Sequence, residues 1–263
     1  MSDSIPNYSE TLNTLIADPI TGALSTYLYD GKQCVDTTKF SGLNQAIYIK
    51  GLDPTVQSLS HPNKISLLED GPIIKTLRID CSLEGANSIS YYYTVFRDLN
   101  YVQLSTLIDK KPIRDKESLH IAFPFNINYP VNRIGISDTF YIPGKGQIPG
   151  ANHDFYSVQR WIDVSDSKFG ITLSSPQAAL FEIGSLTDER PVNNSVKAWK
   201  PQPTPSATLF LYALNNYWNT NFKADQSGPI RFDCYLQFHH QFDINSAKHF
   251  GEEMTNPLIL WWR

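Results

Sequence analysis

The sequence predicts an all-β fold built from many short antiparallel strands, with one short helix near the C-terminus. Runs in which apolar and polar residues alternate recur along the chain, as expected of strands with one buried face. The 17 prolines and 14 glycines supply the turns that many short strands need. The short spacings leave little room for the crossover helices of parallel strands, so we expect antiparallel neighbours. All-β units of this length occur as one domain, which predicts a single β-sandwich domain over residues 1–263.

Two runs show the strand pattern most clearly. In residues 230–238 (IRFDCYLQF) every second residue from Ile230 to Phe238 is apolar, and the residues between them are mostly polar. The alternation repeats in residues 117–125 (ESLHIAFPF), where Pro124 lacks an N–H and favours an edge, a bulge or the end of the strand. Similar runs predict strands over residues 77–83, 89–96, 102–108, 169–173 and 208–214.

Tight-turn sequences separate several of these runs. Asp30-Gly31 lies between candidate strands 24–29 and 33–35, and this pair readily adopts the positive φ angles of a two-residue hairpin turn. We expect Asp70-Gly71-Pro72 and Glu84-Gly85 to act in the same way.

Three segments depart from the strand pattern. Residues 197–205 contain three prolines within five residues and predict an extended surface connector. Residues 132–152 are rich in glycine and proline and predict a long loop, of the kind that often carries function. Residues 246–254 predict a short helix with Asn245 or Ser246 as its N-cap.

Charge and hydropathy exclude some classes of partner. The chain has 22 Lys plus Arg against 26 Asp plus Glu, a net charge of −4, and lacks a long basic run, so nucleic acid is not an expected partner. No apolar run approaches the roughly 20 residues of a membrane helix, and the N-terminus lacks the order of a signal peptide. The compartment in which the protein works stays open.

The three cysteines predict buried thiols rather than a disulfide framework. Cys34, Cys81 and Cys234 are odd in number, far apart in the sequence, and each lies within a strand-like run.

Several stretches carry a family resemblance. The runs NNYWNTNFKADQSG (215–228), KESLHIAFPFNI (116–127) and GANHDFYSVQRWIDV (150–164) resemble the C-terminal β-rich region of glycoside hydrolase family 38 α-mannosidases, and the resemblance extends over nearly the whole chain. It implies a galactose-mutarotase-like supersandwich, in which two large antiparallel sheets pack face to face. It also implies a catalytic N-terminal domain, which this chain lacks, as the partner on the same or a separate polypeptide.

The segment 215–228 supplies the first group of candidate site residues. Tyr217 and Trp218 can stack on the C–H faces of a sugar ring, while Asn216, Asn221 and Gln226 carry amides that both donate and accept hydrogen bonds. The resemblance implies that this part of the chain lies near the catalytic domain. The alternative is structural, with the aromatic residues closing one end of the sandwich.

The second group of candidates follows the predicted loop. His153 and Asp154, together with Tyr156 and Gln159, are candidates for a sugar-facing rim or for contact with a catalytic domain. A carboxylate beside an imidazole can orient it or raise its pKa. A local capping or hydrogen-bonding role is the simpler explanation, and we assign no catalytic residue.

Neither metal chemistry nor paired carboxylates are predicted in this chain. Family 38 enzymes depend on zinc held by their catalytic domain, and the six histidines here do not match the early His-x-Asp motif, so zinc is implied for the absent domain alone. Asp109, Asp115 and Glu117 alternate with lysine and arginine, which indicates a solvated turn with surface ion pairs rather than a catalytic pair.

These observations lead to one functional hypothesis and two alternatives. The first is a non-catalytic C-terminal domain of an α-mannosidase-like glycoside hydrolase, inactive alone, which packs on a zinc-dependent catalytic domain and helps shape a cleft for mannose-containing glycans. The second is a stand-alone carbohydrate-binding module. The third is a mutarotase-like protein, which requires a convergent His and Glu that no spacing in the sequence identifies.

Overall fold

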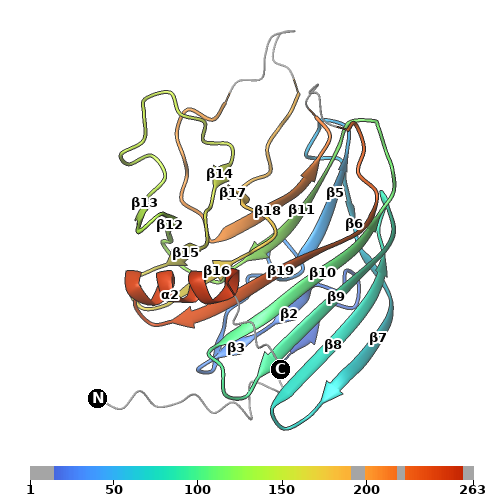
Figure 1. Ribbon diagram of the computed structural model, residues 1–263, viewed down its shortest axis with the longest axis horizontal. Coiled ribbons are helices and arrows are strands. Elements are labelled where there is room, and N and C mark those ends of the chain that lie inside the picture. Colours follow the sequence, from blue (N-terminus) through green and yellow to red (C-terminus); the bar gives the residue numbers. More distant parts are fainter. Residues whose placement is uncertain (1–14, 191–198, 218–222, 257–263) are drawn as a thin grey trace, which may run out of the picture.

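The computed structural model describes residues 15–190, 199–217 and 223–256. Within these ranges the strands form two large antiparallel sheets that pack face to face (Figure 1). The larger sheet has nine strands, in the spatial order β13 (Thr139–Tyr141), β12 (Val131–Ile136), β15 (Ile162–Ser165), β16 (Gly170–Ser174), β19 (Gly228–His239), β10 (Tyr101–Lys110), β9 (Ala86–Phe96), β8 (Ile74–Ser82) and β7 (His61–Asp70).

The smaller sheet contains β11, the strand around which the candidate site is built. Its order is β14 (Tyr156–Ser157), β17 (Leu180–Ile183), β18 (Thr208–Asn215), β11 (Glu117–Pro124), β5 (Gln45–Lys50) and β6 (Gln57–Leu59). Two short pairs lie beside the sheets, namely β1 (Ile16–Ala17) with β2 (Leu24–Thr26) and β3 (Leu28–Tyr29) with β4 (Lys32–Gln33). The predicted all-β class with two large antiparallel sheets is confirmed.

The predicted strands are confirmed to within a few residues at their ends. In β19 the odd-numbered neighbours of the core residues are more exposed, while Phe232, Cys234, Leu236 and Phe238 are buried as the alternation predicts. Pro124 is the last residue of β11, one of the positions expected for a residue without an N–H. The β3–β4 hairpin turns at Asp30-Gly31, whose φ angles are 48° and 72°.

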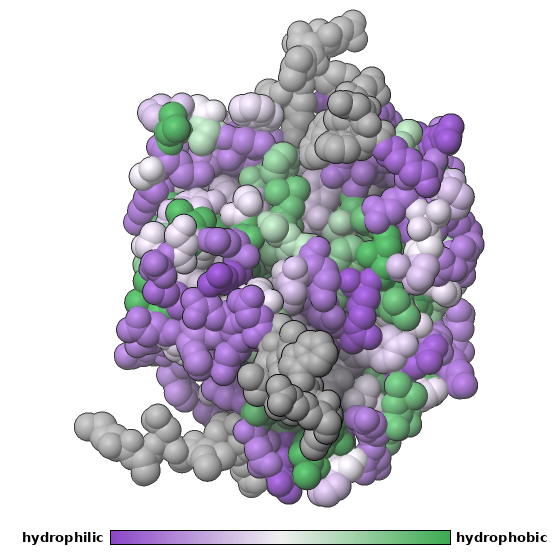
Figure 2. All heavy atoms as spheres, viewed as in Figure 1, coloured by the Kyte–Doolittle hydropathy of each residue, from purple (hydrophilic) through white to green (hydrophobic). Residues whose placement is uncertain are grey.

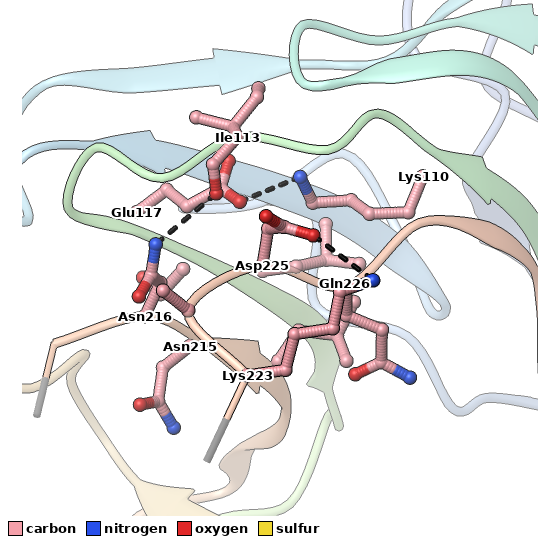
Figure 3. Close-up of a pocket in the computed structure, with 12 residues that line it drawn as sticks. Lys110, Ile113, Glu117, Asn215, Asn216, Lys223, Asp225 and Gln226 are labelled. Carbon is pink, nitrogen blue, oxygen red and sulfur yellow. Dashed lines mark hydrogen bonds and ion pairs between the residues drawn. The ribbon is translucent and has the colours of Figure 1, made fainter. Parts of the chain in front are cut away.

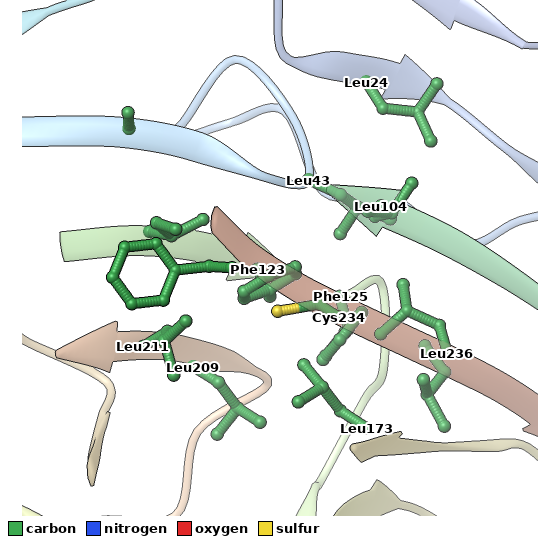
Figure 4. Close-up of a cluster of buried hydrophobic side chains, with 14 of the residues drawn as sticks. Leu24, Leu43, Leu104, Phe123, Phe125, Leu173, Leu209, Leu211, Cys234 and Leu236 are labelled. Carbon is green, nitrogen blue, oxygen red and sulfur yellow. The ribbon is translucent and has the colours of Figure 1, made fainter. Parts of the chain in front are cut away.

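The hydrophobic core lies between the two sheets. Figure 4 shows side chains from both sheets meeting there, with Phe123, Leu209 and Leu211 from the smaller sheet and Leu104, Leu173, Cys234 and Leu236 from the larger. All of these side chains are at most 1% exposed. Burial of this apolar surface is the main favourable contribution to folding.

The three cysteines are free and buried, as predicted. Desolvation in the core raises the pKa of the Cys34, Cys81 and Cys234 thiols to about 12, so all three stay protonated at neutral pH.

The prediction of one long loop over residues 132–152 is wrong in its first half, because this part forms strands β12 and β13. The alternation in β12 is hidden by polar and small residues that face neighbouring side chains rather than solvent. Arg133 donates to the buried carboxylate of Asp163 at 3.0 Å. A Cβ at Gly135 would lie 2.5 Å from the Trp161 ring, which leaves room only for glycine.

The predicted helix exists as α2 (Ile244–Thr255), but its N-cap is Asp243 rather than Asn245 or Ser246. The Asp243 carboxylate accepts the backbone N–H groups of both of those residues, at 2.7 and 3.0 Å. The helix packs beside β16 (Figure 1), with Phe250 and Gly251 buried. Within the described ranges no helix is long and apolar enough to cross a membrane.

The stretch between β10 and β11 departs from the solvated turn that was predicted. Lys110 and Glu117 form an ion pair at 2.6 Å, and their side chains are only 4% and 7% exposed. The Tyr48 hydroxyl donates to the second oxygen of Glu117 at 2.8 Å, and Lys110 also donates to the Lys111 carbonyl at 2.9 Å. These extra hydrogen bonds help compensate for removing the two charges from water.

We expect the shared core to make Leu211→Ala strongly destabilising. The variant removes a fully buried side chain and leaves a cavity, so the free energy of unfolding should fall by about 2–5 kcal/mol. Leu67→Ala is the matched control, since Leu67 is 54% exposed on β7 and its loss should cost roughly 0.5 kcal/mol or less. Urea unfolding of both variants measures the difference, and equal losses would contradict the placement of the core.

We expect Lys110→Met to destabilise the protein because it leaves the Glu117 carboxylate buried without its cation. The loss should be about 3–5 kcal/mol, and adding Glu117→Gln should restore part of it. Lys50→Met is the control, because the Lys50–Glu84 pair is exposed and should contribute less than about 1 kcal/mol. If urea unfolding shows similar losses for the two single variants, the pair is not buried as described.

Candidate functional site

A polar cavity lies at one end of the smaller sheet, where the β10–β11 connection meets the segment that leads from β18 to β19. We call it the Asn216 cavity; its volume is about 220 Å³. Figure 3 shows Lys110 and Glu117 on one side and Asp225 with Lys223 on the other. The remaining lining residues are Ile113, Ser118, Leu119, Leu214, Asn215, Asn216, Ala224 and Gln226.

An ion pair between Arg114 and Asp225 joins the two walls of this cavity. Arg114 donates to one oxygen of the Asp225 carboxylate at 2.9 Å, and Lys223 lies 3.3 Å from the other. These contacts lower the pKa of Asp225, chiefly through the hydrogen bond from Arg114. The cavity therefore holds a carboxylate that is ionised at neutral pH, together with cations and amides, which suits it to hydroxyl-rich ligands.

Asn216, one of the predicted contact residues, has a clear structural role. Its side-chain amide donates to the carbonyls of Ile113 and Asp115 at 3.2 and 3.0 Å, and its backbone N–H donates to the Glu117 carbonyl at 2.9 Å. The amide thus closes the β10–β11 connection over the cavity. Gln226 is exposed on the same wall, so its amide faces solvent.

A buried run of polar contacts extends from this wall into the outer face of the smaller sheet. The Tyr217 hydroxyl donates to Ser118 Oγ at 2.7 Å, and Ser118 Oγ lies 2.8 Å from His120 Nε2. His120 Nδ1 lies 2.7 Å from Glu182 Oε2. We call these four residues the Tyr217 chain; Ser118, His120 and Glu182 are each at most 2% exposed.

The Tyr217 end of the chain has a consistent direction of hydrogen bonding. Ser118 Oγ accepts from Tyr217, whose pKa burial raises to about 12, so the phenol stays neutral. The Ser118 hydroxyl then has its own proton to donate to His120 Nε2. At the other end, His120 Nδ1 and Glu182 Oε2 are in contact without the geometry of a hydrogen bond.

The second group of predicted residues meets the same outer face from the other side. The Thr187 backbone N–H donates to the other oxygen of Glu182 at 2.6 Å, and its hydroxyl donates to the Asp154 carbonyl at 3.5 Å. Phe155 packs edge-on against Tyr212, which stacks on His120 with ring centroids 4.5 Å apart. The segments around Tyr217 and Asp154, far apart in sequence, therefore converge on one buried cluster.

The other members of the second group take different places. His153 Nδ1 lies 3.4 Å from the Tyr156 hydroxyl, and both residues are buried beside a second cavity. The Asp154 carboxylate accepts the Lys200 backbone N–H at 3.2 Å. Gln159 is exposed and accepts from the Ser137 backbone at the β12–β13 turn, so it lines neither cavity. Trp218 and Asn221 lie outside the described residues.

Ser118, His120 and Glu182 are site residues that the sequence analysis missed. The alternation in ESLHIAFPF places Ser118 and His120 on the face opposite Leu119 and Ile121, which was a usable signal. Glu182 lies on β17, two strands away from β11 in the sheet, and no spacing in the sequence relates it to His120.

The remaining ionisable residues do not gather into a metal site within the described part of the chain, where no three His, Cys, Asp or Glu side chains are placed to hold an ion. His239 contacts Asp163 at 2.7 Å, while its neighbour His240 contacts Asp30 at 3.2 Å, so the two imidazoles point to different partners. The described residues therefore do not fit a zinc ion.

Comparison with known proteins gives a likeness of structure without a likeness of sequence. No family model matches the chain, and no curated protein matches its sequence. The fold is similar to an α-mannosidase from Enterococcus faecalis, with a TM-score of 0.60 and 13% identity over 93% of this chain and 32% of that one. A glycosyl hydrolase family 38 protein from Enterococcus faecalis gives a TM-score of 0.60 and 14% identity, over 93% and 33% of the two chains.

A galactose mutarotase-related enzyme from Lactobacillus acidophilus is also similar, with a TM-score of 0.44 and 6% identity over 88% of this chain and 95% of that one. The chain spans about a third of the length of the α-mannosidases that it matches. The resemblance read from the sequence motifs is thus confirmed at the level of the fold, which is similar to about a third of each of these two proteins.

Proposed function

We propose that this chain acts as the non-catalytic C-terminal domain of an α-mannosidase-like glycoside hydrolase, packing on a zinc-dependent catalytic domain and helping to shape its carbohydrate cleft. The observation that carries the proposal is the fit of nearly the whole chain to about a third of two solved family 38 proteins. In this proposal the other two thirds supply zinc, the nucleophile and the chemistry.

The Asn216 cavity is the surface we assign to this contact. Its walls are fixed by the Asp225 ion pairs and by the Asn216 amide, so a partner meets a surface that is already ordered. The two cavity-wall candidates with amide side chains, Asn216 and Gln226, are proposed contact residues together with Tyr217, Trp218 and Asn221. Figure 2 shows one face of the molecule, mostly hydrophilic at its sides, with hydrophobic residues gathered toward the middle.

Two alternatives rest on specific observations. A stand-alone carbohydrate-binding module is favoured by the amides and ionised carboxylate that line the Asn216 cavity. A mutarotase-like protein needs a convergent His and Glu, and His120 and Glu182 are a pair of these residue types in contact at 2.7 Å. Both side chains are at most 1% exposed, however, and a sugar would have to displace the Tyr217 chain to reach them.

We expect the endogenous protein to be physically joined to a family 38 catalytic domain. Affinity purification from the source cells with an antibody against this chain, followed by mass spectrometry, tests the prediction. Peptides of such a catalytic domain should appear, either in a band well above 29.8 kDa or as a separate co-purified chain. Recovery of this chain near that mass without catalytic-domain peptides would overturn the proposal.

We expect residues 1–263 alone to leave an aryl α-mannoside unhydrolysed, with or without added zinc, because in this proposal the zinc and the nucleophile belong to the other two thirds of a family 38 protein. Turnover that a chelator abolishes would contradict a non-catalytic role. Calorimetry with mannose oligosaccharides on the same sample separates the alternatives, since heat of binding at millimolar sugar supports a stand-alone module. Faster anomer interconversion in polarimetry, lost in His120→Gln, would instead favour the mutarotase-like alternative.

A further inference from the structure

A second cavity, which we call the His153 cavity, lies between the loop that carries His153 and the proline-rich segment 200–206. Its volume is about 370 Å³, within the range of small-molecule sites. The side chains that the argument uses are Lys39, His153, Tyr156, Ser185, Lys200 and Ser206. They come from four separate parts of the chain, so the cavity exists only in the folded protein.

The lining of the His153 cavity is electropositive. Lys39, Lys200 and His153 all line it, and no Asp or Glu is among its lining residues in the described ranges. Asp154 follows His153 in sequence but is not a lining residue; it is 2% exposed, and its carboxylate accepts the Lys200 backbone N–H. A positively charged cavity in a chain whose net charge is −4 indicates an anionic ligand.

The donors of this cavity are held in place by neighbouring groups. The Lys200 ammonium donates to the Ser185 hydroxyl at 2.7 Å, which fixes it at the wall. Burial raises the pKa of Tyr156 above its usual value, so its phenol stays protonated and can donate to His153 Nδ1 at 3.4 Å. The imidazole proton then lies on Nε2, available to a ligand.

We propose that the His153 cavity binds the phosphate monoester of a hexose. Two ammonium groups and an imidazole N–H match a phosphate, whose charge of roughly −1.5 to −2 near neutral pH exceeds that of a carboxylate. The hydroxyls of Ser185 and Ser206 also belong to lining residues, and each already accepts a hydrogen bond, from Lys200 and from the Thr208 backbone, so each has its own proton to donate to a sugar hydroxyl. Binding needs only this chain, so the inference goes beyond the proposed contact with a catalytic domain and stands apart from it.

Calorimetry on the full chain tests this inference with mannose 6-phosphate, inorganic phosphate, mannose and a hexuronate. Mannose 6-phosphate should bind more tightly than each of the others. Lys39→Met and Lys200→Met should each weaken it about tenfold or more, since each removes a charged donor. Lys168→Met is the matched control, because Lys168 is exposed on the β15–β16 turn, and it should bind like the unchanged protein.

The outcomes are distinct. No heat with mannose 6-phosphate, or unchanged affinity in Lys39→Met, would overturn the inference; Lys39 is exposed, so a folding defect would not explain its result. If the hexuronate binds more tightly, the preferred anionic group is a carboxylate rather than a phosphate, and the inference is also overturned. Circular dichroism and thermal unfolding of Lys200→Met and His153→Asn separate lost binding from lost structure. Failure here leaves the antibody purification result untouched, since that experiment involves no ligand.

Discussion

The rest of the site depends on one constraint, which is that strand β11 is buried on both faces. All eight of its residues are buried, although the smaller sheet packs on the larger one with only its inner face. The inner face carries Leu119, Ile121 and Phe123 into the core, while the outer face carries Ser118 and His120 under the segments around residues 153–156 and 185–190. Buried polar groups need partners, and the contacts of the Tyr217 chain supply them for Ser118 and for His120 Nε2.

The larger sheet also buries polar groups on its outer face, beneath helix α2. The Asp163 carboxylate is fully buried and accepts hydrogen bonds from Arg133 at 3.0 Å and Ser165 at 2.7 Å, with His239 at 2.7 Å on its other oxygen. In both sheets a buried carboxylate organises residues from several strands. These outer faces therefore fix the positions of loops and turns that the hydrophobic core alone does not reach.

The burial of polar residues on the outer faces explains which strands the sequence predicted and which it did not. The strands with one wet face, such as β19, alternate cleanly and were predicted, as was the hairpin at Asp30-Gly31. Strands β12 and β15 were missed because buried polar residues such as Asn132 and Asp163 conceal the alternation. Edge strand β7 was missed for the opposite reason: it is almost wholly exposed and includes the apolar residues Ile65 and Leu67.

The candidate site was predictable only in part, because contacts between strands that are distant in the sequence hold it together. The resemblance singled out the segments around Tyr217 and His153, and the structure brings both to the outer face of one sheet. Glu182 joins the two segments. Its contact with His120 depends on the order of the strands in the sheet rather than on spacing in the sequence. The charged run 109–117 was misjudged because the Lys110–Glu117 pair is covered by Tyr48, a contact made from β5.

The two cavities lie at opposite ends of the Tyr217 chain and share no lining residue. The Asn216 cavity is bounded by the Tyr217 end of the chain, and the loop of His153 is tied to its Glu182 end through Thr187. A ligand in one cavity therefore does not contact the groups that line the other, and coupling would need a second arrangement of the cluster between them. A domain bound at the Asn216 cavity and an anion bound at the His153 cavity should therefore neither assist nor exclude one another unless they touch.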